Sequence, residues 1–293
     1  MNCDSPVRIL VRDSYYVRVP CGHCLACRLN KSKQFSARII GEASMYKDNC
    51  FITLTYDEEH CPKSLSKRDL QLFMKSFRQS LSPKKIRYFA CGEYGSSTGR
   101  PHYHIIVFGL SKYDDVFKRS VLSKLLEGQN GFSATLDAWS KDGKSKGNVF
   151  VGDVSPQSAK YVAGYVMKKQ GDSYHDSTWY KEQGLIPPFV LMSRRPGIGA
   201  TYGDKYKERF KHNPFVVLGN SRVGLPRYLD NRLFSDDLQR KIEKMRAIAD
   251  GFKEGFLESQ KAGLLYSNWL AMQQEQNEMN LAKKLSLGKK GKC

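Results

Sequence analysis

The distribution of apolar residues divides the first 170 residues into segments with two different periods. Alternating β-branched and aromatic residues predict strands at residues 51–56, 85–92, 102–108 and 148–154. Apolar residues spaced three and four apart predict helices at residues 29–46, 67–81 and 114–128, and another from residue 155 onward. Ser66 is a suitable N-cap for the second helix. This mixture of elements indicates an α+β fold.

The rest of the chain divides into loops and a helical C-terminal region. The polar, glycine-rich residues 130–147 predict an exposed loop with a short helix at Trp139, and little regular structure is expected beyond residue 171. The apolar spacing at residues 236–280 predicts a helical hairpin, followed by a basic, disordered tail at residues 287–292. We therefore divide the chain into residues 1–50, 51–170, 171–230 and 231–293.

The charge balance indicates the class of partner. Lysine and arginine number 48 against 29 aspartate and glutamate residues, which gives a net charge of +19 and a pI near 9.5. Such an excess favours a polyanionic partner, first nucleic acid and second a membrane surface. No apolar run is long enough to span a bilayer, and the N-terminal residues lack the apolar stretch of a signal peptide. We therefore expect a nucleic-acid-binding protein whose eight cysteines are reduced in a cytoplasm.

Cysteines form a C-x-x-C-x-x-C run near the N-terminus, at Cys21, Cys24 and Cys27. Thiolates at this spacing can bind zinc if a fourth ligand comes from elsewhere in the chain. An iron–sulfur cluster is less favoured, because a fourth cysteine at suitable spacing is missing. The alternative is a set of reduced cysteines packed at the start of a helix. The candidates for the fourth zinc ligand are Cys3, His23, Cys50 and Cys61.

The strand that begins near Pro101 carries His102 and His104. Residues two apart on a strand point to the same face, so both imidazoles can reach one point. Glu93 follows the preceding predicted strand, and a hairpin of the two strands would bring it near the histidines. Two imidazoles and one carboxylate with open positions suit a divalent metal. The alternatives are histidines that merely share a sheet face and a solvated loop carboxylate.

The helix that begins near Pro156 carries two tyrosines. Tyr161 and Tyr165 are one turn apart and share a face, which Lys168 continues. A nearby cation would favour the phenolate of a tyrosine, whose pKa is ordinarily about 10. Attack of that phenolate on a phosphodiester would leave a covalent phosphotyrosine. The alternative is a pair of core tyrosines on an amphipathic helix.

Basic residues near these features are candidates for contacts to DNA phosphates. Arg194 and Arg195 lie in the sequence Ser-Arg-Arg-Pro-Gly-Ile-Gly, where proline and glycine suit a phosphate-contacting loop, and a solvated turn is the alternative. Arg100, Lys160 and Lys169 complete the predicted DNA-binding set.

Together these features resemble the HUH endonuclease superfamily, whose members initiate rolling-circle DNA replication. The resemblance rests on three motifs in order: a Thr-rich strand at residues 51–56, an H-x-H strand preceded by Glu93, and a Y-x-x-x-Y helix with lysines. The two-tyrosine form is similar to the initiators of microviruses. The cysteine run and residues 92–95, 100–104 and 193–199 are similar to the gokushovirus branch.

The resemblance implies a palm-like antiparallel sheet of five strands flanked by helices, with a helical C-terminal extension. It implies that His102 and His104, with Glu93 as third ligand, bind Mg²⁺ or Mn²⁺. It also implies a location in the host cell cytoplasm. The implied partners are single-stranded and origin DNA, a host helicase and a host DNA polymerase.

In this family Tyr161 and Tyr165 correspond to nucleophiles, and Lys168 matches a lysine three residues after the second tyrosine. Gly164 stands at the equivalent position after the first tyrosine, so the two tyrosines are not equivalent in sequence. The implied reaction leaves a 5′-phosphotyrosine and a free 3′-OH that primes synthesis. It conserves the energy of the broken bond, so the displaced strand is religated without ATP.

Two alternatives share parts of this pattern. A mobilisation relaxase or a transposase of the same superfamily uses the same metal and tyrosine chemistry at different DNA sites. A non-catalytic single-stranded DNA-binding protein with a basic groove would account for the charge alone. The chain contains no G-x-x-x-x-G-K-[ST] loop, which argues against a helicase domain within it.

Overall fold

The computed structural model describes residues 3, 6–11, 15–22, 24–95, 98–119, 131–155, 159, 162–164 and 177–290. The chain forms two compact units. We call Lys31–Leu233 the sheet unit, and Met1–Asn30 together with Phe234–Cys293 the terminal unit.

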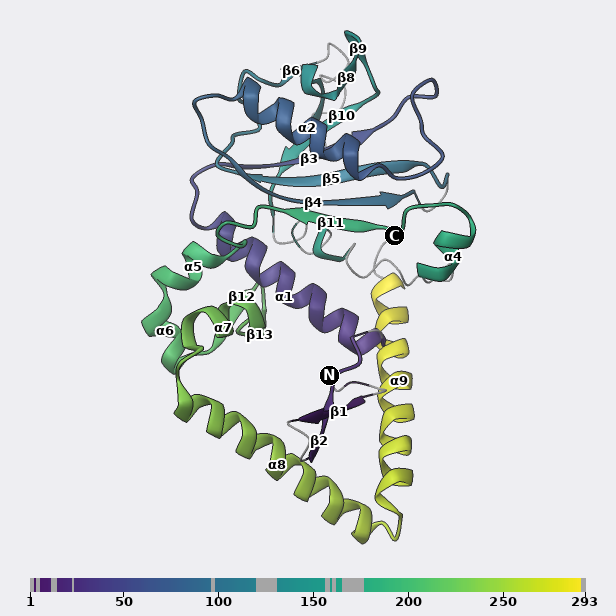
Figure 1. Cartoon of the computed structure of the whole chain (residues 1–293), viewed down its shortest axis with the longest axis vertical. Coiled ribbons are helices and arrows are strands. Elements are labelled where there is room, and N and C mark those ends of the chain that lie inside the picture. The colour runs from purple at the N-terminus through teal and green to yellow at the C-terminus, as the bar shows by residue number, and fades with distance from the viewer. Residues whose placement is uncertain are drawn as a thin grey trace. The chain divides into compact units, whose positions relative to one another are not determined.

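The sheet unit is built on an antiparallel sheet with the strand order β11-β4-β5-β3-β10-β7-β6 (Figure 1). The described sheet thus has seven strands rather than the five predicted, because β11 and the two-residue β6 extend its edges. β11 pairs with a strand far away in the sequence, which leaves little local signal. The strands are β3 (Asn49–Thr55), β4 (Arg87–Tyr94), β5 (Pro101–Phe108), β6 (Lys118–Arg119), β7 (Gly131–Thr135), β10 (Val149–Asp153) and β11 (Phe189–Met192).

One face of this sheet packs against α2 (Lys67–Ser80), as Figure 1 shows. Ser66 caps this helix as predicted, since its side chain accepts a hydrogen bond from the backbone N–H of Asp69. Burial of each large apolar side chain contributes about 1.5–3 kcal/mol to the core. The buried residues include Leu70, Phe73, Met74 and Phe77 of α2 and Ile52, Leu54, Ile105 and Val107 of the central strands.

The opposite face packs against α1 (Leu25–Ala43), whose residues 31–43 belong to the sheet unit. Residues 159 and 162–164 are helical, and Ala159, Val162 and Ala163 lie in the apolar cluster on this face. The start of the predicted tyrosine helix therefore lies on the α1 face. The cluster also includes Ile39 of α1, Phe89 and Cys91 of β4, Ile106 and Phe108 of β5, and Ile198.

Several boundaries differ from the predictions made from local periodicity. α1 begins at Leu25 rather than at residue 29. β4 includes Glu93, which therefore lies within a strand rather than after it. Residues 118–119 pair with β7 instead of continuing the predicted helix at residues 114–128, of which 120–130 lie outside the described residues. Hydrogen bonds to neighbouring strands outweigh the local helical pattern here.

The predicted loop at residues 130–147 contains regular structure. It includes β7, the predicted short helix at Trp139, which is η2 (Asp137–Trp139), and a small hairpin of β8 (Ser140–Lys141) and β9 (Lys144–Ser145). Trp139 is buried against α2, and its indole N–H donates to the Thr55 carbonyl. This anchor keeps the polar segment on the sheet.

The segment beyond residue 171 also contains more regular structure than predicted. Its elements have four to eight residues each, and such short segments show too few repeats for a clear periodic signal. Besides β11 they are α4 (Ser177–Glu182), α5 (Ala200–Lys205), α6 (Lys207–His212), β12 (Phe215–Leu218), β13 (Ser221–Gly224) and α7 (Arg227–Phe234).

The terminal unit contains a separate two-stranded sheet, β1 (Val7–Val11) with β2 (Tyr15–Val19), and two long helices. The predicted C-terminal helices are confirmed as α8 (Leu238–Lys261) and α9 (Tyr266–Lys290), which contact each other. The predicted disordered tail is wrong up to Lys290, because α9 continues to that residue. Across the described residues, no helix combines the length and apolar character needed to cross a membrane.

Candidate functional site

Glu93, His102 and His104 meet on the sheet face that packs against α1. In the register of β4 and β5, Glu93 lies directly opposite His102, and Cys91 lies opposite His104. Cys91 belongs to the apolar cluster on the α1 face, and residues two apart on a strand share a face. The strand pairing therefore brings the three predicted metal ligands together.

The donor atoms of the three side chains are close to one another. His102 Nε2 lies 2.7 Å and His104 Nε2 3.1 Å from Glu93 Oε1, and one donor atom of each residue lies within 4.8 Å of the others. Glu93 is 3% and His104 5% exposed, whereas His102 is half-buried. The cluster thus lies mostly out of water, and solvent reaches it on the His102 side.

Hydrogen bonds on the far side of each imidazole fix its orientation. His102 Nδ1 lies 3.1 Å from the Arg100 carbonyl, which can only accept, so Nδ1 carries a proton and Nε2 of the neutral ring presents a lone pair. His104 Nδ1 lies 2.9 Å from Thr53 Oγ1. Such outer partners raise the basicity of a ligating imidazole and hold its ring in place.

This donor set fits a divalent cation. Two imidazole nitrogens and one carboxylate oxygen suit several divalent ions, and three protein ligands leave positions for water or phosphate oxygens. The metal role of Glu93, His102 and His104 stays a prediction, which this geometry supports.

The predicted nucleophiles, Tyr161 and Tyr165, lie outside the described residues, and so do Lys160, Lys168 and Lys169. The described neighbours of the tyrosines nevertheless locate the segment. Residues 159, 162 and 163 pack in one cluster with Phe89 and Ile106, which lie on the same sheet face as the histidine–glutamate cluster.

The loop at residues 193–199 is held by hydrogen bonds along its whole length. The backbones of Ser193 and Tyr88 bond to each other through the Ser193 N–H at 3.0 Å, and the Ser193 hydroxyl accepts from the Tyr88 N–H. At the other end, the Gly199 N–H donates to the buried Glu42 carboxylate at 2.6 Å. Glu42 also pairs with Arg87, which donates to the Pro196 carbonyl.

Arg194 and Arg195 are exposed at the tip of this anchored loop. Fixed backbone and exposed guanidinium groups are the properties expected of a phosphate-contacting loop. Arg100 differs, because its guanidinium donates to the Tyr56 carbonyl at 2.9 Å and its side chain is half-buried. That bond gives Arg100 a structural role in addition to its predicted contact with DNA.

The described cysteines separate into different environments. Cys3, Cys21, Cys24 and Cys27 form a second cluster with donor atoms within 4.8 Å of one another. Two other candidates for the fourth ligand are excluded from it, because Cys50 is buried in the core under α2 and Cys61 packs at the edge of that core. His23 lies outside the described residues.

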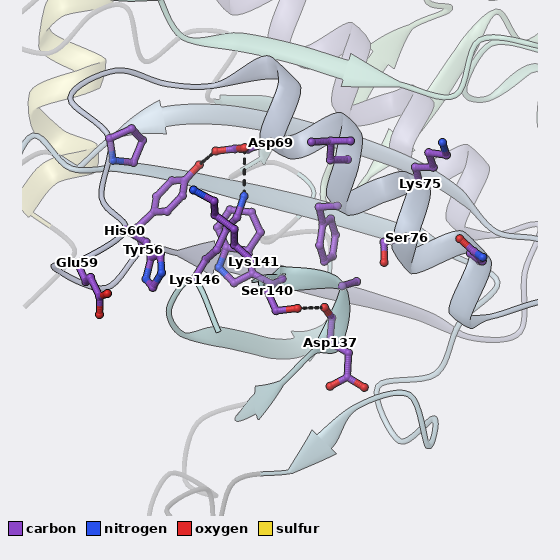
Figure 2. A pocket seen from close by; sticks show the side chains of 16 residues that line it. Tyr56, Glu59, His60, Asp69, Lys75, Ser76, Asp137, Ser140, Lys141 and Lys146 are labelled. Atoms are coloured by element: carbon purple, nitrogen blue, oxygen red, sulfur yellow. Dashed lines mark hydrogen bonds and ion pairs between the residues drawn. The ribbon is translucent and has the colours of Figure 1, made fainter. Parts of the chain in front are cut away.

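A pocket of about 710 Å³ lies on the α2 side of the sheet, away from the histidine–glutamate cluster (Figure 2). Asp69 accepts hydrogen bonds from the Tyr56 hydroxyl at 2.7 Å and from Lys146 at 3.1 Å. Burial, together with the hydrogen bond to Asp69, raises the pKa of Tyr56 far above its usual range, so this phenol stays protonated. The pocket therefore lacks an activated nucleophile among the residues described here.

Sequence reasoning missed Thr53 as a partner of the metal cluster. Thr53 lies opposite His104 in the pairing of β3 with β5, and Phe51 stacks on the His104 ring with centroids 5.7 Å apart. Threonines at residues 53 and 55 on one strand face are a visible signal. Their partner, however, depends on strand register, which the local pattern does not contain.

Comparison with known proteins links the sheet unit to phage replication. Residues 49–170 match the family model of the replication-associated protein ORF2. Replication-associated protein ORF2 of Spiroplasma virus 4 is 31% identical over 264 residues, which cover 83% of this chain and 77% of that protein. No solved structure matches the chain significantly.

Two further relatives extend the comparison. Replication-associated protein VP4 of Bdellovibrio phage phiMH2K is 34% identical over 221 residues, or 71% of this chain. Replication-associated protein ORF4 of Chlamydia phage 1 is 28% identical over 247 residues, or 78% of this chain. The aligned regions span 65% and 58% of these relatives, less than two thirds of their length.

Proposed function

The chain belongs to the replication-associated protein family of microvirus rolling-circle initiators, and from this premise we propose that it nicks and religates viral DNA at the replication origin. The proposed reaction is a transesterification by tyrosine that leaves a 5′-phosphotyrosine and a free 3′-OH. The supporting observation is the Glu93–His102–His104 cluster, which lies on the sheet face where residues 159–163 pack.

Glu93, His102 and His104 would hold a divalent ion, Mg²⁺ or Mn²⁺. When bound, such an ion polarises the scissile phosphate and neutralises the charge that develops on it. The Arg100 carbonyl and the Thr53 hydroxyl keep both imidazole rings oriented, so the site is formed before DNA arrives.

Tyr161 and Tyr165 act as nucleophiles in this proposal. A phenolate oxygen bonds to phosphorus while the bond from phosphorus to O3′ breaks, and O3′ takes up a proton to become the hydroxyl primer. Lys168 favours the phenolate electrostatically. Two tyrosines allow a second cleavage while the first link still holds the old strand end.

The anchored loop at residues 193–199 would contact DNA phosphates through Arg194 and Arg195. The excess of basic residues adds affinity that is independent of sequence. We place this activity in the host cell cytoplasm, where a host helicase would unwind the duplex and a host polymerase would extend the 3′-OH.

The test is a covalent adduct assay with single-stranded origin DNA labelled at its 3′ end, because the 3′-side product carries the tyrosine. With Mn²⁺, the native protein should yield a labelled adduct on a denaturing gel. His104→Ala should lower the yield on the order of 100-fold, while its affinity for the same DNA stays largely unchanged. His212→Ala is the matched control, since His212 is exposed and outside the cluster.

The tyrosines are tested in the same assay. Either Tyr161→Phe or Tyr165→Phe should still form an adduct, and the double variant should form none. Tyr113→Phe, at an exposed tyrosine, should behave as native. Cleavage by the double variant, or DNA attached to any other residue, would refute the two-tyrosine mechanism. DNA binding with no adduct from any variant would indicate a non-catalytic binding protein.

A further inference from the structure

The cysteine cluster of the terminal unit has no part in the proposed nicking reaction. Cys21, Cys24 and Cys27 surround the first residues of α1, and Cys3 joins them from the other end of the β1–β2 hairpin. We propose that these four cysteines bind one structural Zn²⁺ as a tetrathiolate site.

The spacing of the sulfur atoms fits a single tetrahedral ion. Zinc–sulfur bonds of about 2.3 Å at tetrahedral angles place neighbouring sulfurs about 3.8 Å apart. The Sγ atoms of Cys24 and Cys3 lie 3.8 Å apart, and all four sulfurs lie within 4.8 Å of one another. In a [4Fe–4S] cluster each thiolate binds a different iron, which spreads the sulfurs further than this.

Backbone groups around the cluster favour thiolates. The Cys21 N–H donates to Cys3 Sγ at 3.2 Å, the Cys24 N–H to Cys21 Sγ at 3.3 Å, and the Cys27 N–H to Cys24 Sγ at 3.5 Å. The last bond is an N-cap interaction, since α1 begins directly after Cys24. The positive end of the helix dipole also stabilises the net negative charge of a zinc tetrathiolate.

The ligands also explain how a short hairpin stays ordered. Isolated two-stranded hairpins are marginally stable in water. β1 leaves Val7 and Ile9 nearly half exposed, at 47% and 45%. Cys3 precedes β1 and Cys21 follows β2, so the ion would close the open end of the hairpin and join it to the start of α1.

This site differs in kind from the Glu93 cluster. Four thiolates fill a tetrahedral shell and leave no position for substrate, which is typical of structural zinc. Two imidazoles and a carboxylate leave positions open. The chain would therefore carry a closed structural ion and a separate exchangeable one.

Metal content of the purified full chain tests the proposal. After exhaustive dialysis, mass spectrometry should find one zinc per chain, and His104→Ala should retain it. Cys24→Ser and Cys3→Ser should each lose it. Cys61→Ser is the matched control and should keep the zinc, because Cys61 lies outside the cluster.

A second measurement covers variants that fail to fold. Zinc is extracted from the native protein with a chelator, and limited trypsin digestion is followed at Arg8 and Arg18 of the hairpin. Extraction should accelerate cleavage at both arginines, and added Zn²⁺ should restore protection. A folded native protein without stoichiometric zinc would overturn the proposal. So would stoichiometric iron, a disulfide among the four cysteines, or zinc that is lost with His104→Ala but kept with Cys24→Ser.

Discussion

At the scale of single residues, the proposed metal site depends on side chains that bind no metal themselves. Thr53 Oγ1 lies 2.9 Å from His104 Nδ1, and Phe51 stacks on the same ring. His104 is 5% exposed, so its ring has few alternative partners if the threonine is removed. The position of His104 is thus set by β3, a strand that contributes no predicted ligand.

We predict that Thr53→Val weakens Mn²⁺ binding about 10- to 100-fold, because it removes the hydroxyl that orients His104 while keeping the side-chain volume. Titration calorimetry with Mn²⁺ and the metal dependence of cleavage measure the effect. Thr55→Val is the matched control, since the Thr55 hydroxyl donates to the Asn148 carbonyl and has no bond to the cluster. Equal Mn²⁺ affinity in both variants would exclude a positioning role for Thr53.

At the scale of elements, the loop at residues 193–199 owes its conformation to contacts with distant strands and helices. Glu42 of α1 is fully buried and accepts from Arg87 and from the Gly199 N–H. Arg38 of α1 donates to the Ile198 carbonyl at 2.9 Å. One helix therefore fixes the loop that presents the two exposed arginines.

We predict that Glu42→Ala lowers the free energy of unfolding by about 3–5 kcal/mol, because it leaves the Arg87 guanidinium without its buried counter-charge. Urea denaturation measures this change. Glu208→Ala serves as control, since Glu208 pairs with Lys211 at the surface, and it should leave the unfolding midpoint unchanged. A native midpoint for Glu42→Ala would show that the buried pair does not stabilise the loop.

At the scale of the whole molecule, the net charge of +19 determines how the protein meets DNA. Each phosphate neutralised by lysine or arginine releases condensed counterions, so affinity falls as salt rises. Charge alone does not identify which basic residues contact DNA. The anchored loop nominates Arg194 and Arg195 among the described residues, because their backbone is fixed and their side chains are exposed.

We predict that the double variant Arg194→Ala/Arg195→Ala reduces the slope of log affinity against log salt by about 1.4, because each single-strand phosphate that is no longer neutralised lowers the slope by about 0.7. Fluorescence anisotropy with a single-stranded oligonucleotide measures the slope. Lys118→Ala/Lys141→Ala changes the charge equally at exposed positions away from the loop and should leave the slope closer to native. Indistinguishable slopes for the two double variants would contradict a specific role for the loop.

The sequence by itself determined the features that depend on near neighbours along the chain. Strict alternation predicted β3 and β10, and apolar spacing with a capping serine predicted α2. The His102/His104 spacing was sufficient to place two imidazoles on one strand face. These predictions held because strand and helix periodicity act over a few residues.

Only the tertiary structure decided which distant residues meet. It placed Glu93 within β4 and opposite His102, paired Thr53 with His104, chose Cys3 over Cys50 and Cys61, and added β11 to the sheet edge. Each of these depends on strand register or on contacts between residues far apart in the sequence. The physical reason is that register is set by the combined burial of all the strands, and no local window of sequence contains that information.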